Sequence, residues 1–119
     1  TLGAHTINHA NLKQLTTNEV LYEMTESKRI LSERTGIPIH HFAYPFGSPH
    51  CVGPREFALA HKAGYQSAVT TRLANIFNEH RENLCALPRI YGATADDFLT
   101  AMSGAPTLIR YRKRVVFDR

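Results

Sequence analysis

His5 and His9 are the residues of this chain best suited to chemistry, because two imidazoles separated by three residues can bind one divalent metal ion. The chain contains seven histidines in 119 residues, and chance alone supplies about 0.4 pairs at this spacing. The pair therefore predicts a metal site only where other residues support it. Two hydrogen-bonded surface histidines are the alternative interpretation.

Four segments of the chain support the metal site by their order and spacing. They read LGAHTINHANL (residues 2–12), HFAYPFG (41–47), AGYQSAVTT (63–71) and ALPRI (86–90). Together they resemble motifs of the polysaccharide deacetylases, the carbohydrate esterase family 4 that shares the NodB homology domain. The resemblance covers most of the chain and implies an α/β fold, a β/α barrel of the NodB type.

The resemblance implies a hydrolase that removes acetyl groups from the N-acetylated sugars of a polysaccharide or oligosaccharide. It also implies a divalent metal ion as cofactor, expected to be Zn²⁺, with His5 and His9 as the metal ligands of this chain. Two imidazoles and one carboxylate leave positions open for water and a substrate oxygen, as in a catalytic metal site. In that chemistry the metal polarises the acetyl carbonyl and activates a water, whose proton passes to an aspartate base. Thr6 would support the loop through its hydroxyl.

Two features of the family have no counterpart in this sequence. The family's adjacent aspartates, in a Thr-Phe-Asp-Asp type motif, supply the third metal ligand and the base, whereas Asp96-Asp97 lies near the other end and is predicted to begin a helix. Many members also have an arginine in the third motif and a histidine general acid in the last, where this chain has Ala43 and residues 88–90. The catalytic residues therefore stay open, with His50 and Arg89 as candidates.

These departures lead us to expect that residues 1–109 are the C-terminal portion of a deacetylase domain, a partial barrel that lacks its first strands. A chain of 119 residues is short for such a barrel, which usually needs on the order of 200 residues or more. We expect the fragment alone to be inactive, and its open sheet to need a preceding N-terminal segment or a homo-oligomer partner. A non-catalytic relative that binds glycan is the alternative.

The turn at residues 44–47 and Arg89 are expected to bind the sugar. Tyr44, Pro45, Phe46 and Gly47 would form one wall of the groove, with backbone donors for an oxyanion. An ordinary strand-to-loop turn packed by aromatic residues is the alternative. Arg89 follows a proline in a predicted strand and would point to the mouth of the barrel, unless it pairs with a surface carboxylate.

Composition and charge narrow the class of protein. Hydrophobic residues make up 43% of the chain and charged residues 20%, which is typical of a folded domain and not of a disordered one. No apolar run approaches 18 residues, so no membrane span is predicted. The net charge of +4 arises in a basic tail at residues 110–119. Nucleic acid is therefore not expected as a partner, and a binding module that uses the tail is the alternative. The location of the protein is implied only by the resemblance, which suggests the cell envelope or a secreted protein.

The predicted elements alternate as in an α/β unit. A capping box at Thr16-Glu19 begins a helix that ends at Gly36, a second helix lies between Pro54 and Gly64, and a third begins at residues 94–97. The inner side of the first helix is predicted to carry Val20, Leu21, Met24, Ile30 and Leu31. Strands are predicted at residues 2–6, 41–44, 67–71 and 84–90, with His5 and His9 at the end of the first, and His80 in a loop.

Overall fold

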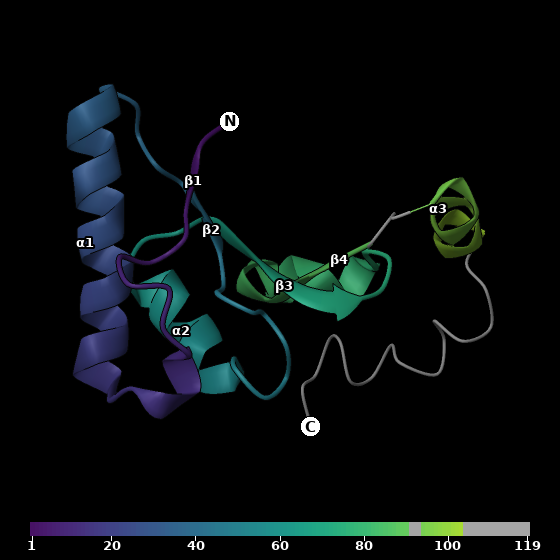
Figure 1. Cartoon of the computed structure of the whole chain (residues 1–119), viewed down its shortest axis with the longest axis horizontal. Helices are drawn as coiled ribbons and strands as arrows, with labels where there is room; N and C mark the ends of the chain where they lie inside the picture. Colours follow the sequence, from purple (N-terminus) through teal and green to yellow (C-terminus); the bar gives the residue numbers. More distant parts are fainter. Residues whose placement is uncertain (91–93, 104–119) are drawn as a thin grey trace.

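Strands and helices alternate along the chain in the computed structural model, which describes residues 1–90 and 94–103 (Figure 1). The four strands of the sheet are all parallel and lie in the order of the sequence. They are β1 (Gly3–Ala4), β2 (His41–Ala43), β3 (Ser67–Leu73) and β4 (Leu87–Arg89). Parallel neighbours need crossover connections, and α1 (Thr17–Thr35) and α2 (Pro54–Lys62) provide the first two. The predicted α/β class, with the parallel sheet of a NodB-type fold, is confirmed.

Helix α1 begins and ends at the residues that the sequence indicates. The Thr16 hydroxyl accepts a hydrogen bond from the Glu19 N–H, and the Glu19 carboxylate accepts one from the Thr16 N–H. Gly36 ends the helix in the left-handed conformation, with φ of 66°. Both signals act within four residues, so the tertiary structure is not needed to read them.

The buried face of α1 differs from the predicted one. Its buried residues are Val20, Glu23, Met24 and Ser27, while Leu31 packs partly buried against the core and Leu21 and Ile30 are only half-buried. The prediction for Leu21 and Ile30 was therefore only partly right: both lie at the margins of the buried face, which polar Glu23 and Ser27 share with Val20 and Met24. Glu23 can do so because donors from another segment meet it there.

Aromatic side chains fill the core between the sheet and helices α1 and α2. Phe42 on β2 lies against Tyr44 and Tyr65, with ring centroids 5.2 and 4.9 Å apart. The two buried tyrosines end in hydrogen bonds, since Tyr44 donates to the Cys85 carbonyl (2.7 Å) and Tyr65 to the Met24 carbonyl (2.8 Å). These bonds tie the sheet to α1 and to the segment before β4, because a buried hydroxyl needs a partner.

The segment between β3 and β4 contains two 3-10 helices, η2 (Asn78–Glu82) and η3 (Leu84–Ala86). The predicted strand at residues 84–90 is thus shortened to Leu87–Arg89, because the first three residues form η3. His80 lies in η2 and is 1% exposed, so its prediction as a loop residue was wrong. Helix α3 (Ala95–Met102) follows β4 and begins within residues 94–97, as predicted.

Strands β1 and β4 form the two edges of the sheet within the described residues. Whether a preceding segment or a second copy covers the β1 edge stays a prediction. The boundary expected at residues 109 and 110, and the basic tail beyond it, lie outside the described residues. In the part of the chain that the structure describes, no helix combines the length and apolarity that crossing a membrane requires.

Candidate active site

His5 and His9 lie side by side in the loop that follows β1. Their ring centroids are 4.8 Å apart and the ring planes meet at 62°. Both residues are exposed, at the carboxyl end of an edge strand. The rings therefore lie on the same side of the strand end, where a metal ion could contact both.

The orientation of the His5 ring is set by a hydrogen bond to β2. Its Nδ1 lies 2.7 Å from the carbonyl oxygen of Ala43. A carbonyl can only accept, so Nδ1 carries the proton in this bond, and in the neutral ring Nε2 is then the nitrogen with the free lone pair. Histidine ligands of metal sites commonly make such a bond, which fixes the tautomer and the ring orientation.

The loop between the two histidines has an unusual backbone. Thr6 and His9 have φ values of 63° and 53°, in the left-handed region, which costs a residue with a side chain roughly 1–2 kcal/mol. The Thr6 hydroxyl donates to the His5 carbonyl (2.6 Å) and accepts from the His9 N–H (3.1 Å). Thr6 thus supports the loop through its hydroxyl, as predicted.

Sequence reasoning missed Glu23 and Asn8, which tie this loop to α1. The Glu23 carboxylate accepts hydrogen bonds from the backbone N–H groups of Ile7 and Asn8 and from the Asn8 side chain. Burial by itself raises the pKa of Glu23, but these hydrogen bonds outweigh it and hold the pKa below its ordinary value. The available signal was a charged residue on the inner face of an amphipathic helix.

Phe46, in the turn after β2, lies beside His9, and Gly47 follows it against β3. The Phe46 ring is 55% exposed and its centroid lies 4.8 Å from that of His9. Phe46 has φ of 60°, and its carbonyl accepts a hydrogen bond from the Thr71 hydroxyl (2.7 Å). The Gly47 carbonyl accepts from the Thr71 N–H (3.0 Å). The end of β3 therefore holds the turn against the histidine loop.

Tyr44 and Pro45 lie beneath this turn. Tyr44 is 1% exposed, and burial raises the pKa of its hydroxyl, which donates to Cys85. Pro45 is also buried. Of the four residues expected to form a groove wall, the described structure exposes the Phe46 side chain. Contact of the other three with a sugar stays a prediction.

Arg89 and His50, the candidate catalytic residues, occupy different places. Arg89 is exposed at the end of β4, and its Nε donates to the carbonyl of Thr70 on β3 (2.8 Å). His50 is exposed in the turn after Pro49. Asp96 is exposed at the start of α3, so the acidic pair begins a helix as predicted.

A line of contacts joins the carboxyl ends of the four strands. His5 after β1 bonds β2, the turn after β2 bonds β3, and Arg89 on β4 bonds β3. Parallel strands place their carboxyl ends at one edge, where α/β proteins commonly carry their chemistry. Among the described residues, His, Cys, Asp and Glu form no group of three that could hold a metal. His5 and His9 are therefore two possible metal ligands, and no third lies with them among the described residues.

Comparison with known proteins shows the family of this chain. The family model of the polysaccharide deacetylases matches residues 1–68, more than half of the chain. The chain belongs to the polysaccharide deacetylase family. The matched residues include the two histidines and the turn at residues 44–47. No curated protein sequence is similar enough to count as a match.

Solved structures of deacetylases share the fold. The Streptococcus pyogenes deacetylase PplD, in complex with acetate, is 25% identical with a TM-score of 0.72. The polysaccharide deacetylase BC0361 from Bacillus cereus is 27% identical, and BA0330 from Bacillus anthracis 30% identical, both with a TM-score of 0.70. The match with PplD covers 84% of this chain and 43% of PplD. The match with BC0361 covers 86% of this chain and 32% of BC0361, and the match with BA0330 covers 85% and 31%.

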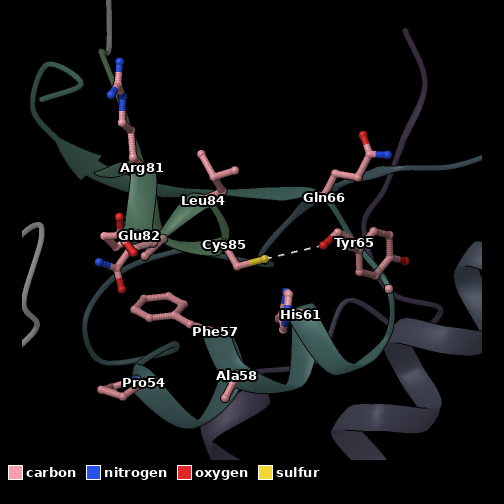
Figure 2. A pocket seen from close by; sticks show the side chains of 13 residues that line it. Pro54, Phe57, Ala58, His61, Tyr65, Gln66, Arg81, Glu82, Leu84 and Cys85 are labelled. Carbon is pink, nitrogen blue, oxygen red and sulfur yellow. Dashed lines mark hydrogen bonds between the residues drawn. The ribbon is translucent and has the colours of Figure 1, made fainter. Parts of the chain in front are cut away.

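This member of the deacetylase family also has a hollow of about 740 Å³ (Figure 2), and neither His5 nor His9 lines it. It lies between α2, which supplies Phe57 and His61, and the segment before β4, which supplies Leu84 and Cys85. The Cys85 thiol donates to the Tyr65 carbonyl (3.8 Å). This hollow is at the amino ends of β3 and β4, and none of the predicted site residues lines it. The hollow and the predicted histidine pair therefore lie at opposite edges of the sheet.

Proposed function

We propose that this chain carries the histidine ligands of a metal-dependent hydrolase that removes acetyl groups from the N-acetylated sugars of a polysaccharide. The observation that carries the proposal is the pairing of the His5 and His9 rings, 4.8 Å apart at the carboxyl edge of the sheet. The His5 bond to the Ala43 carbonyl supports it, because it leaves Nε2 free to bind a metal. Membership of the polysaccharide deacetylase family supports the substrate class.

The donor set fits a divalent metal ion such as Zn²⁺. Imidazole nitrogens suit zinc, and a catalytic zinc site commonly combines them with a carboxylate and an open position. When bound, the metal supplies a Lewis acid for the acetyl carbonyl and for a water molecule. The third ligand and the aspartate base are proposed to come from residues outside this chain. PplD, solved with acetate, supports a reaction in which acetate leaves this site.

The turn after β2 is proposed to bind the acetyl oxygen through the backbone N–H of Phe46. Tyr44 already donates its N–H to the Val69 carbonyl, Gly47 donates to Pro45, and Pro45 has no N–H. Within the described residues, the Phe46 N–H makes no hydrogen bond. A preorganised backbone donor can stabilise the negative charge that develops on the oxygen. The exposed Phe46 ring would then contact the sugar, with Arg89 and His50 as further candidates at the same edge.

Acetate release from an N-acetylglucosamine oligomer tests the proposal. The longer protein that contains this chain should release acetate, lose the activity on chelation and regain it with added Zn²⁺. We expect His5→Ala and His9→Ala each to abolish activity through loss of metal. His61→Ala is the control, because His61 is an exposed histidine on α2.

Two results would contradict the proposal. One is activity that survives both chelation and the double substitution of His5 and His9, since the mechanism requires the metal. The other is tight binding of the oligomer without acetate release under any metal condition, which would favour a glycan-binding relative. Equal loss of activity in His61→Ala would mean that the histidine substitutions act through folding.

A further inference from the structure

Glu23 is a buried carboxylate on α1 that faces the loop carrying the two histidines. The residue is 5% exposed. Its Oε2 accepts from the backbone N–H groups of Ile7 (2.8 Å) and Asn8 (3.0 Å), and its Oε1 accepts from the Asn8 side-chain amide (2.6 Å). Both carboxylate oxygens are thus used on the two residues that lie between Thr6 and His9.

Packing of α1 does not by itself require a carboxylate at this position. Val20 and Met24 are fully buried on the same face and supply its apolar contacts. Two other glutamates of α1, Glu26 and Glu33, pair with Arg29, whose side chain is exposed. A buried charge is costly unless it is hydrogen-bonded, so the bonds from Glu23 to the loop are what retain the charge there.

The loop needs such bonds because its backbone is unfavourable. Thr6 and His9 both adopt φ values in the left-handed region, and such conformations persist only where surrounding contacts hold them. The Thr6 hydroxyl supplies contacts within the loop. Glu23 supplies the contacts that fix the loop to a rigid helix.

We propose that Glu23 is a positioning residue that holds Ile7 and Asn8 so that the rings of His5 and His9 face one metal ion. This inference rests on the proposed function, because it concerns the metal assigned to these histidines. Glu23 acts through the loop backbone and does not touch the metal. Groups that orient histidine ligands typically change metal affinity by roughly 10- to 100-fold when removed.

Zn²⁺ binding to the longer protein, measured by calorimetric titration, tests the role. Glu23→Ala leaves three loop donors without their acceptor and should weaken Zn²⁺ binding by roughly 10- to 100-fold. Glu23→Gln should retain affinity within a few fold, because the Asn8 amide can turn its oxygen toward the new NH₂ group. Glu33→Ala, the same change at an exposed position of α1, should leave affinity unchanged. Zn²⁺ affinity in Glu23→Ala equal to that of the unsubstituted protein would overturn the proposal.

Amide hydrogen exchange in the metal-free protein measures the positioning separately from the metal. We expect faster exchange at Ile7 and Asn8 in Glu23→Ala, with protection restored in Glu23→Gln. Unchanged exchange at Ile7 and Asn8 in Glu23→Ala would overturn the positioning role. If Glu23→Ala does not fold, Glu23→Gln takes its place. A loss of protection at Ile7 and Asn8 in Glu23→Gln that only equals the loss across the whole molecule would also overturn the role. Failure of the unsubstituted protein to bind Zn²⁺, with normal protection of both amides, would refute the proposed function instead.

Discussion

At the scale of single residues, the site depends on backbone conformations that side chains disfavour. Thr6, His9 and Phe46 have φ values of 63°, 53° and 60°, and Gly47 follows at 64°. Each lies beside a group that the proposed function uses, and each is held by hydrogen bonds of the histidine loop or of Thr71. The cost of these conformations is therefore concentrated at the edge where we place the chemistry.

Gly47→Ala and Gly36→Ala separate steric clash from backbone strain. Both glycines have φ near 65°, but a Cβ on Gly47 would lie 2.6 Å from the Thr71 nitrogen, whereas one on Gly36 would meet nothing within 4 Å. Gly36→Ala should lower the free energy of unfolding by about 1 kcal/mol. Gly47→Ala should lower it by about 1–3 kcal/mol more, because the end of β3 must move. Urea unfolding measures the free energy of unfolding of both variants. An equal decrease in the two would show that the turn accommodates a Cβ at Gly47 without a steric penalty.

At the scale of the elements, η2 is organised around a buried histidine. The Nδ1 of His80 accepts a hydrogen bond from the Phe77 N–H (2.9 Å) at the start of the helix. The side chain is 1% exposed, and burial lowers the pKa of His80 below 6.5, although its contact with the Phe77 carbonyl partly offsets this. The neutral ring is therefore the form that stabilises the segment between β3 and β4.

Stability should fall when the pH drops below about 6.5, the ordinary pKa of histidine. The unfolded chain then binds a proton at His80 that the folded chain resists, so the free energy of unfolding decreases until the lower folded pKa is reached. His80→Asn offers an oxygen near the position of Nδ1 without titrating, and should flatten this dependence. Urea unfolding between pH 5 and 7 measures it, with His61→Asn on the surface as control. An unchanged slope in His80→Asn would count against a role for His80.

At the scale of the whole molecule, the chain supplies one part of the proposed site. It spans 43% or less of the deacetylases whose structures it resembles. The described residues hold two histidines at one sheet edge and no group of three metal-binding side chains. Our proposal therefore takes the remaining ligand and the base from residues beyond those that the structure describes.

The 119 residues by themselves should consequently release little acetate. Without a positioned base, the reaction rate should fall by roughly 10²–10⁴ relative to the longer protein. Acetate release from the same N-acetylglucosamine oligomer, measured for both proteins at equal Zn²⁺, gives the comparison. Equal rates for the two would place the base within this chain and would direct attention to His50.

The sequence alone determined the features that depend on near neighbours. The start of α1 at Thr16, its end at Gly36 and the placement of His5 and His9 after a strand all follow from signals within a few residues. The order and spacing of four segments, at residues 2–12, 41–47, 63–71 and 86–90, predicted the family and the α/β fold. These predictions succeeded because capping, turn formation and motif spacing are local properties.

The tertiary structure alone decided which distant residues meet. Glu23 is 15 or 16 residues from its loop partners, and Tyr44 is 41 residues from Cys85. Periodicity therefore placed Leu21 on the inner face and passed over Glu23, and it could not show that Tyr44 is buried while Phe46 is exposed. The burial of a polar group depends on whether a partner from another segment is present to satisfy it, and that partner is brought into place only when the sheet and helices pack.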